Sequence, residues 1–114
     1  MAEKRGMLIS FSIKSTKIRP SEKTVFFRKL YGWKQVVPNE TKTYEYERPG
    51  ILDEMPHAKV DQSSFIVPEE NFDQIMEFFD EWSSKVMLKT FKVFLDRETE
   101  SIFDEFEESE EEDE

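Results

Sequence analysis

The stretch AKVDQSSFIV, residues 58–67, combines a strand-like pattern with a run of four polar residues, Asp61 to Ser64. Its apolar residues are mostly β-branched or aromatic, which predicts one strand over 58–67. Neither of the two alternating sets of side chains is purely apolar. Because serines leave little bulk above a sheet, we expect another surface to approach this strand closely.

Three more segments have strand-like patterns. MLISFSI (7–13) alternates with period two and predicts a half-buried strand. Its expected inward residues are Met7, Ile9, Phe11 and Ile13. Short strands are also expected over 33–37 and 42–48, and a long last strand over 85–96.

Two segments have apolar residues at helical spacing. The first begins at Ser21 and ends at Gly32, which predicts a helix with a glycine at its C-terminus. The second runs from Pro68 to Trp82. The sequence therefore predicts an α+β protein of the ferredoxin-like β-α-β-β-α-β plan, an antiparallel sheet with both helices on one face.

The uncovered face of such a sheet is a candidate contact surface. In the last strand, four residues are assigned to the core: Met87, Phe91, Val93 and Leu95. The remaining large apolar residues then point to the open face. Exposed apolar residues of this kind predict that another surface covers that face. The candidate dimer or partner face comprises Gln62, Ser64, Val86, Leu88 and Phe94. The cover is a second copy of the chain, a partner protein, or the chain's own C-terminal segment.

The negative charge is concentrated at the C-terminal end. Of 26 acidic residues, 11 lie in 98–114, which contain no base. Residues 1–97 carry 16 bases and 15 acids, and residues 1–50 alone carry 11 bases and 5 acids. We expect one domain over 1–97, with an extended hairpin or loop insertion at 38–57. An acidic tail over 98–114 follows, which we expect to be disordered from Glu107 onward.

Three apolar residues interrupt the acidic segment, Ile102, Phe103 and Phe106. They are candidates to dock as a short helix or strand on a basic, apolar groove. Two places for that groove stay open, the basic first half of the same chain and another protein.

The residue types needed for several kinds of chemistry are absent or scattered. There is no cysteine, and the three glycines form no phosphate-binding loop. We predict no enzyme activity, no catalytic residue, no metal and no cofactor. No apolar run is as long as a membrane span, and the N-terminus predicts no signal peptide, so the expected location is the cytoplasm, without a membrane partner.

Basic and aromatic residues gather around the first predicted helix. Six bases are candidate contacts to nucleic acid or another anion: Lys14, Lys17, Arg19, Arg28, Lys29 and Lys34. Tyr31 and Trp33 stand beside them. Bases next to aromatic rings suit a phosphate backbone with a stacking platform.

Three segments together resemble a known superfamily. The strand MLISFSI, the helix end FFRKLYGW and the strand VDQSSFIV are similar to the small CRISPR adaptation subunit and to the C-terminal domain of phenylacetate-type repressors. Residues 62–65 hold the place of that superfamily's Gln-x-Ser-x-Phe-like pattern. The resemblance implies a ferredoxin-like fold and a dimer. Nuclease members end the first strand with a metal-binding aspartate, whereas residues 10–14 contain no acid.

We therefore predict a non-enzymatic interaction or regulatory module, homodimeric, that binds a partner protein. The alternative is a nucleic-acid-binding regulator that uses the basic half and is gated by the acidic tail. Removal of residues 98–114 should strengthen such binding, and salt should weaken it. A divergent metal-dependent nuclease is the least favoured function, because the first strand lacks its acid.

Overall fold

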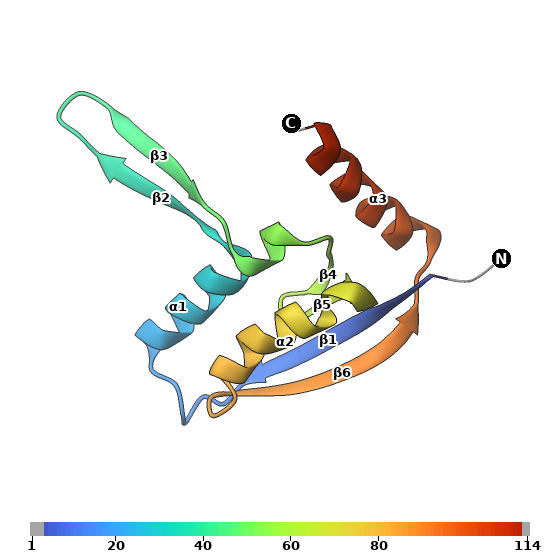
Figure 1. Ribbon diagram of the computed structural model, residues 1–114. Helices are drawn as coiled ribbons and strands as arrows, with labels where there is room; N and C mark the ends of the chain where they lie inside the picture. Colours follow the sequence, from blue (N-terminus) through green and yellow to red (C-terminus); the bar gives the residue numbers. More distant parts are fainter. Residues whose placement is uncertain (1–3, 113–114) are drawn as a thin grey trace.

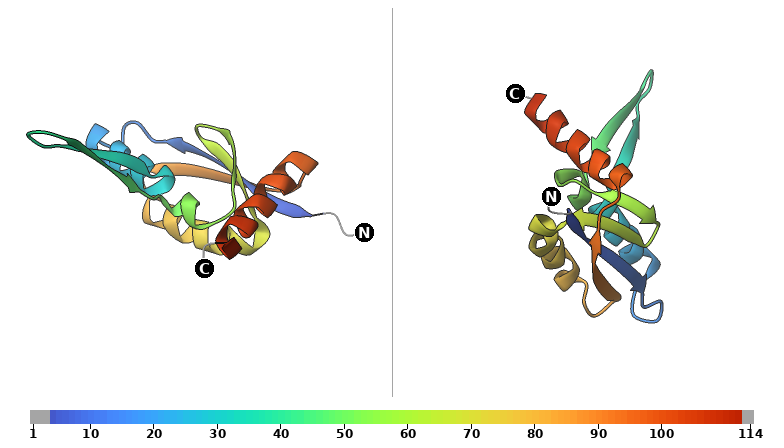
Figure 2. Two further views of the ribbon diagram at one scale, coloured as in Figure 1. Left: turned by 90° about the horizontal axis from the view of Figure 1, so that it is seen from above. Right: turned by 90° about the vertical axis from the view of Figure 1, so that its right-hand side faces the viewer.

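The computed structural model describes residues 4–112 and has an α+β fold, as the sequence predicts (Figures 1 and 2). Four antiparallel strands form one sheet in the order β4-β5-β1-β6. Strand β1 (Arg5–Ile13) lies between β5 (Ser64–Pro68) and β6 (Val86–Phe94). Strand β4 (Ala58–Asp61) pairs with β5 and completes the sheet.

Residues 58–67 form two strands, so the prediction of one strand is wrong. β4 ends at Asp61 and β5 begins at Ser64, which makes the polar run the turn of a tight hairpin. The Asp61 carboxylate accepts a hydrogen bond from the backbone N–H of Gln62 at 2.7 Å. Aspartate side chains favour turns in this way. The polar run is thus explained by the turn, without a covering surface.

Helices α1 (Pro20–Tyr31) and α2 (Phe72–Glu81) pack on the same face of the sheet. The ring of Phe11 on β1 lies 5.4 Å from that of Phe26 in α1 and 5.6 Å from that of Phe79 in α2. The odd-numbered residues of β1 face this core, as their alternation predicts. A short 3-10 turn, η2 (Glu69–Asn71), precedes α2.

The covered and open sides of strand β6 are the reverse of those predicted. Val86 is buried and Leu88 packs against the core, although both were assigned to the open face. Met87 and Phe91, assigned to the core, are 55% and 51% exposed. The register pairs Ile13 with Val86, so the even-numbered residues of β6 share the covered face with the odd-numbered residues of β1.

Strands β2 (Trp33–Pro38) and β3 (Thr43–Arg48) form a separate hairpin that projects from the body (Figure 1). We call this hairpin the arm. It overlaps the insertion predicted at 38–57 but begins directly after α1. The 3-10 turn η1 (Ile51–Glu54) follows the arm and returns the chain to the core, where Leu52 is buried.

The acidic segment is helical over α3 (Arg97–Glu112), so the disorder predicted from Glu107 onward is wrong as far as Glu112, and residues 113–114 lie outside those described. The helix begins where the Asp96 carboxylate accepts the backbone N–H of Thr99 at 2.8 Å. Phe103 is 7% exposed, and Asp104 forms an ion pair with Lys4 at 3.4 Å. The apolar side of α3 therefore docks on the chain's own body, at the end of the sheet (Figure 1).

Candidate interaction site

The arm has two chemically different faces. Cross-strand pairing places Val37 opposite Tyr44, Gln35 opposite Tyr46 and Trp33 opposite Arg48. Directly opposed residues share a face of a hairpin, and so do residues two apart. The aromatic face therefore comprises Trp33, Gln35, Val37, Tyr44, Tyr46 and Arg48. The charged face carries Lys34, Val36, Glu45 and Glu47, with an ion pair of 3.2 Å between Lys34 and Glu45.

The aromatic face is exposed toward the tip of the arm. Val37, Tyr44 and Tyr46 are 38%, 44% and 46% exposed. An isolated two-stranded hairpin is only marginally stable in water, and grouped exposed apolar side chains mark contact sites. Gln35, Val37 and Arg48 are not among the contact residues predicted from the sequence, unlike the bases and rings beside the first helix. Antiparallel pairing of the two predicted strands, 33–37 and 42–48, about the turn at Asn39 would have placed these three residues on the same face as the tyrosines.

Arginine side chains order the aromatic face near the body. The Arg28 guanidinium lies 3.9 Å from the centre of the Trp33 ring, and that of Arg48 lies 5.4 Å from the Tyr46 ring. The Nε–H of Arg48 also donates a hydrogen bond to the Gln35 side-chain oxygen at 2.7 Å. A guanidinium group over an aromatic ring is a favourable contact, so Arg28 and Arg48 help to hold these two rings in place.

A shallow hollow on α1 extends the aromatic face onto the body. Its lining comprises Lys23, Thr24, Phe27, Arg28, Tyr31 and Gly32. Tyr31 stacks on Phe27, and its hydroxyl donates a hydrogen bond to the Gln62 carbonyl oxygen at 2.5 Å. Burial of this hydroxyl raises the pKa of Tyr31. Tyr31 therefore ties α1 to the β4–β5 turn and is not a free stacking platform.

The root of the arm is held by close backbone contacts. Gly32 connects α1 to β2, and Gly50 follows β3. A Cβ atom on Gly50 would lie 2.3 Å from the backbone nitrogen of Gly32. The Asp53 carboxylate accepts the N–H of Gly50 at 2.7 Å. The two glycines thus bring both ends of the arm together on α1, which fixes where the arm leaves the body.

The candidate nucleic-acid contacts fall into two groups at opposite ends of α1, a helix about 18 Å long at 1.5 Å per residue. One group, near the start of α1, comprises Lys14, Lys17 and Arg19. The other, near its end, comprises Arg28, Lys29, Lys34, Tyr31 and Trp33. In the second group, Lys34 is paired with Glu45 and Arg28 is stacked on Trp33. The structure does not bring all these residues into one basic surface.

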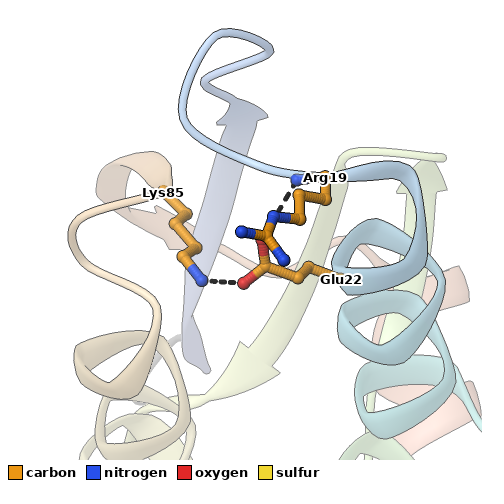
Figure 3. Close-up of polar contacts among 3 residues, drawn as sticks. All are labelled: Arg19, Glu22 and Lys85. Atoms are coloured by element: carbon orange, nitrogen blue, oxygen red, sulfur yellow. Dashed lines mark hydrogen bonds and ion pairs between the residues drawn. The ribbon is translucent and has the colours of Figure 1, made fainter.

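At the first basic group, Glu22 bridges α1 and the start of β6 (Figure 3). One oxygen of its carboxylate accepts the backbone N–H of Arg19 at 3.1 Å, and the other pairs with the Lys85 ammonium group. These contacts favour the charged carboxylate, with the Lys85 contact as the larger cause, and lower the pKa of Glu22 below its ordinary value of 4.5.

Replacement Glu22→Gln is expected to lower the free energy of unfolding at neutral pH. Because the pKa of Glu22 is lower in the folded state, its charge stabilises the fold above the unfolded-state value, and this contribution is lost as the pH falls through the folded-state pKa. Denaturant unfolding of both proteins from pH 7 to pH 3 should show a difference that shrinks on acidification. A difference independent of pH would contradict the ion pair as its cause.

The other candidate residues are distributed over different surfaces. Gln62 lies in the β4–β5 turn, Ser64 lies on the open sheet face, and Val86 and Leu88 belong to the covered face. Phe94 is exposed, and the Arg5 guanidinium lies 5.4 Å from its ring centre. The predicted dimer face is therefore not one surface, because the phase of β6 was assigned incorrectly.

The open sheet face carries a different apolar set from the one predicted. Its members share the side of the sheet away from α1 and α2: Leu8, Ile66, Met87, Phe91 and Val93. In the acidic helix, Phe103 contacts the body, whereas Ile102 remains exposed. Of the two docking places left open for this segment, the structure therefore supports the chain's own body for Phe103.

Comparison with known proteins gives no matching family model, no similar curated protein and no similar solved structure. Within residues 4–112, the side chains described include no group of three or more histidine or acidic residues that could hold a metal ion. None of the helices in that range is both long enough and apolar enough to cross a membrane.

Proposed function

We propose that this protein is a non-enzymatic interaction module that binds a partner protein through the aromatic face of the arm. The observation that carries the proposal is the exposure of Val37, Tyr44 and Tyr46 on one side of a projecting hairpin. Tyrosine supplies large contact area at low entropy cost and is enriched in protein interfaces. Burial of this face would also stabilise the arm, because the arm is a sheet of only two strands.

The charge of the arm favours a protein over a nucleic acid. Residues 33–48 carry three bases and three acids, and the acids Glu45 and Glu47 lie on the charged face. A surface that binds a phosphate backbone needs an excess of bases, because each contact replaces condensed counterions. The division of the basic candidates between the two ends of α1 weakens the nucleic-acid alternative further.

We propose that the sheet with α1 and α2 follows the ferredoxin-like plan and that the arm is inserted after its first helix. The strand order β4-β5-β1-β6 and the strand–helix–strand–strand–helix–strand sequence that remains without the arm support this assignment. The arm is then an addition to a common scaffold, which is where specific functions are usually built.

The test replaces both arm tyrosines, Tyr44→Ser with Tyr46→Ser, and compares capture of proteins from a native extract by chemical cross-linking. The expected result is that a protein cross-linked by the original chain is lost, with affinity at least about 30-fold weaker, as for interface hot spots. The matched control, Glu45→Ser with Glu47→Ser, alters the other face of the same strand and should retain that protein. Circular dichroism checks that both variants are folded.

Two results would overturn the proposal. One is a partner that binds the tyrosine variant as well as it binds the original chain. The other is salt-sensitive capture of nucleic acid by the original chain, which would support the nucleic-acid alternative.

A further inference from the structure

Strand β6 is a long, regular edge of the main sheet. Among the residues that the structure describes, it pairs with β1 alone, in a register without a shift from Val86 to Phe94. The other edge strand, β4, has four residues and an irregular register after Lys59. Short or irregular edges resist pairing with another chain, whereas a long regular edge is a template for it. β6 contains no proline, so every residue retains a backbone donor.

The hydrogen-bond phase of β6 determines which backbone groups face outward. The N–H of Lys14 bonds to the Lys85 carbonyl at 2.8 Å, and the N–H of Leu95 bonds to the Lys4 carbonyl at 2.9 Å. In an antiparallel pair, hydrogen-bonded positions alternate. The odd-numbered residues of β6 therefore direct N–H and C=O toward β1. Leu88, Thr90 and Lys92 direct theirs away from the sheet.

We propose that a second copy of this chain pairs antiparallel along β6, with a two-fold axis at Thr90, which joins the two sheets into one. Thr90 is the midpoint of β6, so this register overlaps the whole strand. It places Lys89 opposite the other copy's Phe91 and Lys92 opposite the other copy's Leu88. An axis at Lys89 or Lys92 would instead place two lysines directly opposite each other, which is unfavourable.

The charges within β6 also permit a second copy as the partner. About Thr90, the lysines lie opposite uncharged residues, because Lys89 faces Phe91 and Lys92 faces Leu88. β6 is therefore complementary to itself in this register, as a two-fold interface requires.

The pairing also accounts for exposed apolar side chains on the open face. Met87 of one copy lies opposite Val93 of the other, and Phe91 lies beside Lys89 across the axis. Cross-strand neighbours on one face pack together, and a lysine beside an aromatic ring is a favourable pair. This inference involves β6 and not the arm, so it stands or falls independently of the proposed function.

The first experiment uses the absence of cysteine in the natural chain. In the proposed register, Thr90 of each copy faces its equivalent at a Cα–Cα distance of about 5.5 Å, which suits a disulfide. The variant Thr90→Cys should form a covalent dimer under mild oxidation. The control Lys92→Cys, on the same face of the same strand, should form much less. Equal cross-linking of the two variants, or none of Thr90→Cys, would overturn the register.

The second experiment removes the outward donor at the axis. Thr90→Pro eliminates an N–H that does not bond to β1, so the monomer should keep its fold, by circular dichroism, and lose the dimer, by light scattering. Thr90→Ala keeps the donor and should remain dimeric. A monomeric original chain, or a dimeric Thr90→Pro variant, would contradict the proposal. If Thr90→Pro does not fold, the comparison of Thr90→Cys with Lys92→Cys still tests the proposal.

Discussion

The substitution Phe26→Ala is expected to lower the free energy of unfolding by about 3–5 kcal/mol, the range for removing a buried aromatic ring. Phe26 is 0% exposed and lies between the two helices and the sheet. Its ring centre is 5.2 Å from Trp82, 5.5 Å from Phe78 and 5.4 Å from Phe11. Because these rings come from β1 and from α2 with its C-terminal cap, no single movement can close the cavity. Denaturant titration followed by tryptophan fluorescence measures the loss.

The neighbouring residue provides the matched control. Val25 lies on the same helix but is 43% exposed, and Val25→Ala should change the free energy of unfolding by less than about 0.5 kcal/mol. Similar losses for the two variants would mean that α1 is held by its own helical propensity rather than by packing of its aromatic face. The small size of the domain makes the difference easy to measure, since total stability is about 5–15 kcal/mol.

Segments with clear periodicity were predicted well from the sequence. The alternation of MLISFSI identified β1 and its buried side, since one face of that strand is covered by helices and the other is not. The helical spacing of Phe26, Leu30, Ile75 and Phe79 identified α1 and α2 in the same way. In these elements the local pattern and the packing agree.

Errors occurred where local patterns were ambiguous. In β6, large apolar residues occupy both alternating sets, so hydrophobicity alone could not assign its faces. The register with β1 decides the phase, and that register depends on the turn after α2, where the N–H of Val86 bonds to the Trp82 carbonyl at 2.9 Å. The incorrect phase then produced an incorrect contact face. In 58–67, Asp61 was a turn signal within a strand-like stretch.

The acidic helix illustrates a non-local effect. Its charge density favoured disorder, and glutamate's high helical propensity was given too little weight. The residue that anchors it, Phe103, packs beside Lys4 and Pro68, which lie far away in the sequence. No local pattern identifies such a docking site. Three members of the aromatic face of the arm, Gln35, Val37 and Arg48, were missed for a related reason, because they join that face only when β2 and β3 are paired in register.

Replacement Gly32→Ala is expected to destabilise the protein by about 3 kcal/mol and to loosen the arm. Gly32 has φ of 81° and ψ of 176°, a conformation that residues with a Cβ rarely adopt. The added Cβ would also lie 2.7 Å from the Arg48 carbonyl oxygen and from the Gly50 nitrogen. These are backbone atoms and cannot rotate away, so the root of the arm must open.

Amide hydrogen exchange distinguishes opening of the root from general destabilisation. If Gly32 positions the arm, exchange in Gly32→Ala should accelerate across β2 and β3 more than across β1, whose hydrogen bonds lie in the main sheet. The control Val36→Ala truncates an exposed side chain on the charged face of the arm and should change neither stability nor exchange at the root. Uniform acceleration through the arm and the sheet would instead mean that the junction at Gly32 supports the whole core.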